Sequence, residues 1–136
     1  MPYLQFDLPA VYAAEQKRRL AERVGRLYSS VMQTTPRIVK VAFRELGADN
    51  LFRCEDEASP RPVVVIMCDI RRGRPAAQRQ ALAAALVAAC SEELGTPVEC
   101  IEVEFTQHPG DEMYRNGALA ADWEPSDQAE PGQSVV

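Results

Sequence analysis

Side chains that bind metals or carry out redox chemistry are scarce in this sequence. It has one histidine, His108, and none of its four cysteines, Cys54, Cys68, Cys90 and Cys100, is spaced as Cys-x-x-Cys. Zinc sites and dithiol centres depend on such pairs or on clusters of histidine and cysteine. We therefore expect no metal ion. We expect the cysteines to pack in the core, where free cysteine is usually found.

Long apolar runs and an excess of positive charge are also missing. No stretch approaches the roughly 20 apolar residues of a membrane-spanning helix. The first residues have neither the basic nor the apolar part of an export signal. The 15 basic residues are outnumbered by 20 acidic ones and form no basic face. We expect a cytoplasmic protein that binds neither membranes nor nucleic acid.

The end of the chain differs in composition from the rest. After Ala121 the charged side chains are all acidic, namely Asp122, Glu124, Asp127 and Glu130. Such a proline-rich, aperiodic segment has too little apolar surface to offset the entropy lost on ordering. The 136-residue chain, 46% hydrophobic, is long enough for one core and too short for two ordinary domains. We predict a single domain over residues 1–121 and an acidic, disordered tail over 122–136, with Trp123 anchoring the chain before the tail.

A repeat emerges when the sequence is compared with itself at a shift of 62 residues. The matched helical positions are Gln16, Lys17, Leu20, Ala21 and Val24 against Gln78, Arg79, Leu82, Ala83 and Leu86. Further along, Val39-x-Val41-x-Phe43 aligns with Ile101-x-Val103-x-Phe105, and both stretches alternate with the period of a strand. The chain therefore contains two copies of one βαβ unit, over residues 2–45 and 63–106.

The repeat predicts an α+β fold in which the two fused βαβ units form a four-stranded mixed sheet. Right-handed crossovers place both helices on one face of the sheet. The other face is then bare, which favours a closed symmetric oligomer. The expected elements are a strand over 3–8, a helix over about 13–32 and a strand over 37–44, followed by a strand over 63–70, a helix over 77–94 and a strand around 101–105.

The second residue is a candidate base. Removal of Met1 would leave Pro2 as a secondary amine at the head of the alternating strand Pro2-Tyr-Leu-Gln-Phe-Asp-Leu8. Burial disfavours the charged form of an amine. An amine held neutral near pH 7 can accept a proton from a substrate.

Three further stretches have a recognisable pattern. They are Ile70-Arg-Arg-Gly-Arg74, Val41-Ala-Phe-Arg-Glu45 with Asn50-Leu-Phe52, and Phe105-Thr-Gln-His-Pro109 with Met113-Tyr-Arg-Asn-Gly117. Together with the βαβ repeat that begins Met-Pro, they resemble the tautomerase superfamily, whose members use an amino-terminal proline as catalyst. The resemblance covers about residues 2–120 and is closest to the cis-3-chloroacrylic acid dehalogenase-like branch.

The resemblance implies roles for several residues. Pro2 and Arg74 would be catalytic, and Arg71 would hold the carboxylate of a small substrate together with Arg74. In malonate semialdehyde decarboxylases the equivalent arginine pair corresponds to Arg72 and Arg74. Lys40 stands where 4-oxalocrotonate tautomerases carry an arginine beside the substrate. The superfamily also implies a homotrimer that needs no cofactor.

Departures from the dehalogenase pattern bear on the reaction. Tyr28 occupies the place of a helix histidine, and Arg115 falls near the water-activating glutamate, with Glu112 as the nearest carboxylate. Tautomerisation needs only a base and an anion site, whereas hydration also needs a group that activates water. The residues therefore favour a tautomerase or isomerase that acts on small α-keto or enol carboxylic acids. We assign Tyr28 and Arg115 to substrate binding.

Other interpretations stay open at this point. The same proline could serve a hydratase, a dehalogenase or a decarboxylase of three-carbon acids, or the protein could be a non-catalytic trimer that binds a metabolite. An arginine-rich turn is often a solvated loop. Tyr28 shares an apolar helical stripe and could be a core residue, and Arg115 could lie at the surface or at a subunit interface.

Overall fold

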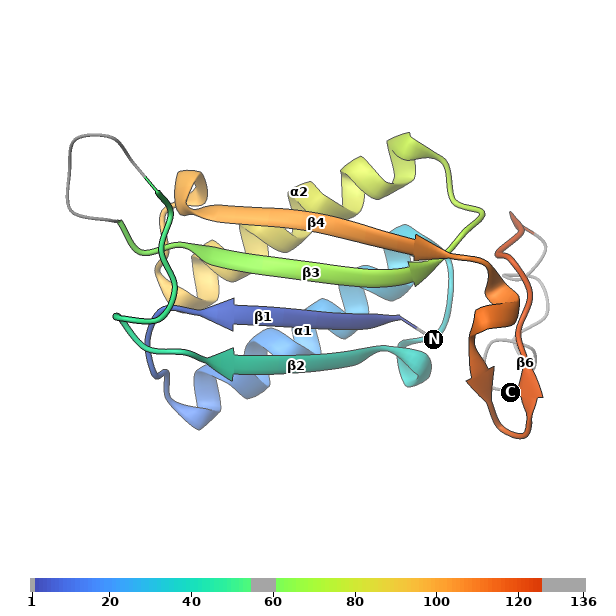
Figure 1. Ribbon diagram of the computed structural model, residues 1–136, viewed down its shortest axis with the longest axis horizontal. Coiled ribbons are helices and arrows are strands. Elements are labelled where there is room, and N and C mark those ends of the chain that lie inside the picture. The colour runs from blue at the N-terminus through green and yellow to red at the C-terminus, as the bar shows by residue number, and fades with distance from the viewer. Residues whose placement is uncertain (1, 55–60, 126–136) are drawn as a thin grey trace.

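The computed structural model describes residues 2–54 and 61–125. It contains two long helices and four long strands, followed by a small hairpin (Figure 1). The strands and helices are β1 (Tyr3–Leu8), α1 (Ala14–Met32), β2 (Lys40–Glu45), β3 (Val64–Arg71), α2 (Ala76–Leu94), β4 (Ile101–His108), β5 (Tyr114–Arg115) and β6 (Ala118–Leu119). Three short 3₁₀ turns are η1 (Pro36–Ile38), η2 (Val98–Cys100) and η3 (Gly110–Glu112).

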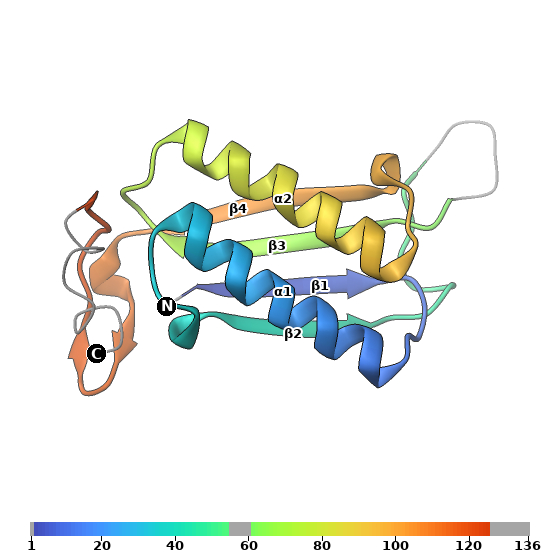
Figure 2. The same ribbon diagram turned by 180° about the vertical axis from the view of Figure 1, so that it is seen from behind.

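The main sheet has the strand order β2-β1-β3-β4. The β1 and β2 strands are parallel, as are β3 and β4, while the central pair β1 and β3 is antiparallel. Both helices cover the same face of this sheet, as the two opposite views show (Figures 1 and 2). The predicted α+β architecture is confirmed.

The repeat is visible in the boundaries of the elements. The helices α1 and α2 begin at residues 14 and 76, and the turns η1 and η2 begin at 36 and 98, so both pairs differ by 62 residues. The helices also end alike, because Gln33 and Gly95 both adopt left-handed backbone conformations, with φ of 55° and 75°. Their N–H groups donate to the carbonyl oxygens of Ser29 and Ser91. Each half of the chain is therefore one copy of the same unit.

The second strand begins later than predicted, at Lys40 and not at residue 37. Pro36 opens a 3₁₀ turn, in which the Val39 N–H donates to the Pro36 oxygen over 3.0 Å. The Thr35 hydroxyl caps the turn by accepting from the Arg37 N–H. The local hydrogen bonds of the turn thus replace the first predicted pairs of the strand.

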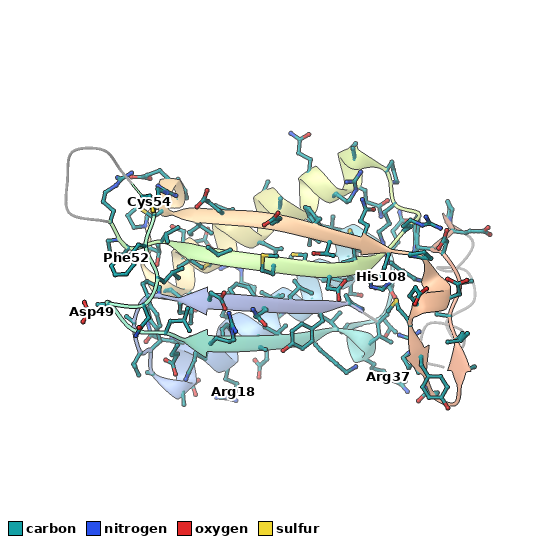
Figure 3. The ribbon with its side chains drawn as sticks, in the orientation of Figure 1. Arg18, Arg37, Asp49, Phe52, Cys54 and His108 are labelled. Atoms are coloured by element: carbon teal, nitrogen blue, oxygen red, sulfur yellow. The ribbon has the colours of Figure 1, made fainter. Side chains whose placement is uncertain are left out.

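The core lies between the helices and the covered face of the sheet. Alternate residues of the central strands point into it, as the periodicity of the sequence predicts. Its largest fully buried side chains are Leu4, Phe6, Leu8, Leu20, Val24, Tyr28, Met32, Val63, Ile66, Ile70, Leu82 and Leu86. Cys68, Cys90 and Cys100 are buried, as predicted, but Cys54 is exposed because it lies in the connection that follows β2 (Figure 3).

No helix covers the other face of the sheet (Figures 1 and 2). The strand residues that point to this face, which alternate with those of the core, are largely polar. Arg44 and Asp7 form an ion pair across β2 and β1, with 2.7 Å between Nε and Oδ1. His108 Nε2 lies 3.0 Å from Asp69 Oδ1, across β4 and β3.

Neither long helix of the described residues has the apolar length that a membrane span requires.

Several segments that are far apart in the sequence meet at one end of the sheet. The start of β1, the start of β2 and the ends of β3 and β4 all lie there, beside the β5–β6 hairpin (Figure 1). Figure 3 shows His108 and Arg37 at this same end. Residues 71–74, here called the arginine turn, begin at the last residue of β3 and therefore lie at the end of the sheet where the chain begins.

Candidate active site

Pro2 is buried at the entrance to the central strand β1. Its carbonyl oxygen accepts a hydrogen bond from the Lys40 N–H over 3.2 Å, which extends the β1–β2 pairing to the second residue of the chain. On the other side, Leu4 pairs with Cys68 in the antiparallel ladder, so continuing the register brings Pro2 opposite Ile70. The sheet therefore holds Pro2 on both sides, next to the segment that leads into the arginine turn.

Arg74 is the most buried of the candidate cations, with 5% of its surface exposed. Its Nε donates to the carbonyl oxygen of Met32 over 2.9 Å, at the last residue of α1. That oxygen is one of the carbonyl groups that a helix leaves without a partner at its C-terminus. Arg74 thus joins the arginine turn to the end of the first helix, and its charge is held inside the fold.

Tyr28 lies one helical turn before Met32 and is 1% exposed. The Cζ atom of Arg74 is 5.9 Å from the centre of its ring, which is within the range of a cation–π contact. Burial raises the pKa of the Tyr28 phenol to about 12, and this effect outweighs the opposing effect of the Arg74 charge. The phenol is therefore neutral near pH 7 and can donate a hydrogen bond.

Arg71 and Arg115 lie close enough to influence each other. Burial lowers the pKa of the half-buried Arg115, and the positive charge of Arg71 lowers it further. Two cations that repel each other form a region of positive potential, which an anion would stabilise. Arg71, Arg74 and Tyr28 belong to the same electrostatic environment, since the charges of both arginines act on the phenol.

Lys40 and Arg72 lie outside the cluster formed by Tyr28, Arg71, Arg74 and Arg115. Lys40 is exposed at the start of β2, and Val41, the next residue, packs against the core, so Lys40 belongs to the bare face of the sheet. The Arg72 side chain is 56% exposed, and its Nη2 lies 3.5 Å from Asp122 Oδ2. Glu112 is exposed in the η3 turn. Among the residues in the described ranges, no group of three histidine, cysteine or acidic side chains could hold a metal ion.

Sequence reasoning missed the segment that covers the arginine turn. Residues 120–123, here called the strap, run back across the turn after the β5–β6 hairpin. The Arg71 Nη1 donates to the Ala121 oxygen over 2.6 Å, and the Trp123 N–H donates to the Arg72 oxygen over 2.7 Å. Asp122 Oδ1 accepts from the Gly110 N–H over 2.7 Å. The strap extends past residue 121, where we expected the domain to end.

Trp123 is the anchor of the strap, as we predicted for this residue. It is 4% exposed, and the centre of its ring lies 4.8 Å from Arg74 Cζ. The guanidinium of Arg74 therefore contacts two aromatic rings, those of Trp123 and Tyr28. Within the sequence, the one signal for this contact was the single tryptophan placed directly before an acidic, aperiodic segment.

Two glycines allow the strap to lie directly on the backbone of the core domain. A Cβ atom on Gly73 would lie 2.0 Å from the Trp123 oxygen, and one on Gly110 would lie 1.9 Å from the Ala121 carbonyl carbon. Gly73 also has a backbone φ of 130°, which residues other than glycine rarely adopt. The short sequence Arg72-Gly73-Arg74 thus provides both the buried cation, Arg74, and the glycine on which the strap packs.

Comparisons with known proteins bear on the fold. No protein-family model matches the sequence, and neither does any curated protein. Among solved structures, a member of the cis-3-chloroacrylic acid dehalogenase family is 25% identical, with a TM-score of 0.79 over 96% of this chain and 98% of that one. The protein Pt0534, inactivated by 2-oxo-3-pentynoate, is 25% identical, with a TM-score of 0.77 over 88% of this chain and 95% of that one.

A third structure, a fused 4-OT that forms an asymmetric trimer, is 24% identical, with a TM-score of 0.77 over 87% of this chain and 95% of that one. The chain consists of two fused βαβ units, with a proline at the head of the first strand. This arrangement is the tautomerase fold. The chain has this fold, and the solved structures that it is similar to belong to the tautomerase superfamily.

Proposed function

We propose that this protein is an amino-terminal-proline tautomerase, which catalyses keto–enol proton transfer on small α-keto or enol carboxylic acids without a cofactor. One observation carries the proposal. Pro2 is buried at the same end of the sheet as Arg71, Arg74 and the neutral phenol of Tyr28. A base, an anion site and a hydrogen-bond donor are the groups that such a proton transfer requires.

In the proposed reaction, the Pro2 nitrogen accepts a proton from one position of the substrate and returns it to the other. For an enol acid, the proton leaves the hydroxyl group and is delivered to the neighbouring carbon. Nearby guanidinium groups favour the neutral form of the amine, because a second positive charge close to them is unfavourable. The same cations attract the substrate carboxylate, so one set of charges serves both the base and the substrate.

Arg71 and Arg74 are proposed to bind the carboxylate, and Arg74 to stabilise the negative charge that develops on the enolate oxygen. Tyr28 supports this charge as a neutral donor. Arg115 adds positive potential beside Arg71. Arg72 and Lys40, which lie outside the cluster, are proposed to attract the anionic substrate from solution.

The bare face of the sheet supports a homotrimer. It has no cover within the described chain, and the edge strands β2 and β4 each pair on one side only. A fused 4-OT of the same fold forms a trimer. We propose that three copies of the chain enclose these sheet faces, with each copy folding as the single domain predicted from the sequence.

The first experiment asks whether Pro2 has a free amine. The intact mass of the purified full chain is expected to lack Met1, because an attached methionine would acylate the proline nitrogen and remove its basicity. Ketonisation of phenylenolpyruvate is then followed beside the turnover of 3-chloroacrylate. We expect the first reaction and not the second, since Arg115 stands near the position of the water-activating carboxylate.

The inactivator of Pt0534 provides a second test. Addition of the Pro2 nitrogen to the triple bond of 2-oxo-3-pentynoate would form one C–N bond, with a proton moving to the adjacent carbon. The expected product is a single adduct on the amino-terminal peptide, with loss of activity. Retention of Met1, or full activity with the adduct on another residue, would refute the proposed role of Pro2.

A further inference from the structure

The indole N–H of Trp123 has no acceptor among residues 2–54 and 61–125, although its Nε1 atom is buried. A buried donor without a partner is unfavourable, because it has given up its hydrogen bonds to water. Buried indole N–H groups usually have a partner, so an orphaned one calls for an explanation. The sequence contains one tryptophan, and it carries this donor beside the arginine turn.

The surroundings of Trp123 determine which kind of acceptor suits the indole N–H. The guanidinium of Arg74 lies against the ring, with Cζ 4.8 Å from its centre, and is itself 5% exposed. A cation with so little access to water favours a negatively charged neighbour. The acceptor for the indole N–H would lie beside this cation, so an anion suits the position best. A carboxylate has two oxygens that can accept the hydrogen bond.

The indole is held in position before any ligand arrives. The main-chain N–H of Trp123 donates to the Arg72 oxygen over 2.7 Å, and the preceding strap residues are fixed by Arg71 and Gly110. Gly73 places the backbone of Trp123 in direct contact with the arginine turn. A donor fixed in this way loses little conformational entropy when a ligand binds.

The geometry points to Trp123 as a substrate-binding residue, whose indole N–H donates to a carboxylate oxygen of the small keto or enol acid that Arg74 neutralises. This inference takes its class of substrate from the proposed function. It adds a neutral donor to the arginines, and it makes the strap a part of the site. The strap would then fix the distance between the donor and Arg74, and with it the size of the acid that can bind.

The single tryptophan makes the inference directly measurable. The ¹⁵N-labelled full chain gives one indole N–H signal, which can be followed while 2-oxobutanoate is added. We expect the proton signal to move downfield in a saturable manner, as it does when an N–H group donates to a carboxylate. Butanone, which has the keto group without the carboxylate, serves as the control and should leave the signal in place.

The matched variant is Trp123→Phe, which keeps an aromatic ring over Arg74 and removes the N–H. Because a hydrogen bond to a charged group contributes about 1.5–3 kcal/mol, binding of 2-oxobutanoate should weaken by roughly tenfold or more. The KM for phenylenolpyruvate should rise by a similar factor with little change in kcat. Tyr114→Phe removes one polar group from a 67% exposed aromatic residue of the hairpin and should change neither constant.

The outcomes separate the two proposals. If phenylenolpyruvate is not turned over but 2-oxobutanoate still moves the indole signal, the proposed reaction is wrong and the binding role of Trp123 stands. If turnover is normal but the indole signal does not move at saturating 2-oxobutanoate, a water molecule or a partner subunit satisfies the N–H, and the inference is overturned. An unchanged KM in a folded Trp123→Phe variant would overturn it as well.

Discussion

The guanidinium of Arg71 donates from Nη1 to the main-chain oxygen of Ala121 over 2.6 Å. This hydrogen bond joins a residue at the end of β3 to one that lies 50 positions later in the sequence. The arginine turn and the strap therefore form a single structural unit. A change in either segment should therefore displace the cations of the proposed site.

Substitution of Pro2 by alanine should reduce kcat/KM for phenylenolpyruvate by about 10²–10⁴-fold, the usual contribution of a positioned general base. Alanine provides a primary amine with a different basicity and a less restricted backbone. The oligomeric state, measured by light scattering, should stay the same, because alanine keeps the main-chain carbonyl that accepts from the Lys40 N–H and leaves the strand pairing from Tyr3 onward in place. Nearly full turnover by the variant would make Pro2 a structural residue.

Substitution of Arg74 by alanine should raise KM and lower kcat together, because the same cation would bind the carboxylate and stabilise the enolate. It should also lower the melting temperature, because the variant loses the donor to the Met32 carbonyl at the end of α1.

Arg37→Ala is the matched control. Arg37 is exposed at the same end of the sheet, outside the cluster, and its loss should leave both constants within about twofold, in line with the small effect of an isolated surface charge (Figure 3). Equal kinetic effects of the two substitutions would move the site elsewhere.

Substitution of Gly73 by alanine should displace the strap, because the new Cβ atom would lie 2.0 Å from the Trp123 oxygen. We expect a loss of about 1–3 kcal/mol in the free energy of unfolding, the usual cost of overpacking. Quenching of Trp123 fluorescence by acrylamide should increase. Gly117→Ala provides the control, since Gly117 also has a positive φ, of 82°, but has no atom within 4 Å of the added Cβ. If both variants gave the same quenching, backbone strain and not displacement of the strap would be the cause.

Truncation after Glu124 should leave the melting temperature and the oligomeric state unchanged. Residues 126–136 lie outside the described residues, and their proline-rich acidic composition offers little apolar area to bury. Truncation after Ala120 removes Trp123 as well and should lower the melting temperature, since that residue is 4% exposed. A changed KM in the longer truncated chain would show that the tail acts on the proposed site.

The stability of the protein should fall as the pH rises from 10 to about 12, in part because of Tyr28. Its pKa is raised by burial from 10.0 to about 12, so in this range the folded protein keeps a proton that the unfolded chain has lost. The linkage therefore destabilises the fold with increasing pH, at about 1.4 kcal/mol for each unit of pKa shift. Chemical denaturation at several pH values should show a shallower decline for Tyr28→Phe than for the native chain.

Cys68 and Cys90 contribute to the same decline, because burial raises the pKa of each thiol from 9.0 to about 12. The comparison therefore uses the difference between the native chain and the variant, in which the thiols cancel. Identical slopes in the two proteins would mean that the phenol is solvated in the folded state.

Much of the fold could be read from periodicity, because each βαβ copy encodes its own strand and helix. The shift of 62 residues set the positions of both helices, and the alternation of Leu4, Phe6 and Leu8 indicated which side of β1 is buried. Boundaries were less accurate where a turn competes with a strand, as at Pro36. There, the hydrogen bonds of the turn decide the result, and they leave no periodic trace in the sequence.

The site could be predicted only in part, for a similar reason. Pro2 and Arg74, which we propose as catalytic residues, belong to short local patterns that can be recognised in the sequence. The contacts of Ala121 and Trp123 with the arginine turn are tertiary, since they join segments that share no pattern. Lys40 shows the converse, since it follows the expected pattern but belongs to the face of the sheet that the core does not use.

The internal repeat has a consequence for the number of reactive centres. At the shift of 62 residues, the counterpart of Pro2 is Val64, and those of Arg71 and Arg74 are Pro9 and Tyr12. Val64 lies in the middle of the polypeptide, so its nitrogen is an amide and cannot act as a base, and no arginine stands at the positions that correspond to Arg71 and Arg74. The two halves of the chain thus share a backbone fold, but only one end of the sheet has the amine and the arginines of the proposed site. Complete inactivation of the proposed trimer should consume three equivalents of a proline-directed reagent, although the scaffold has six equivalent strand ends.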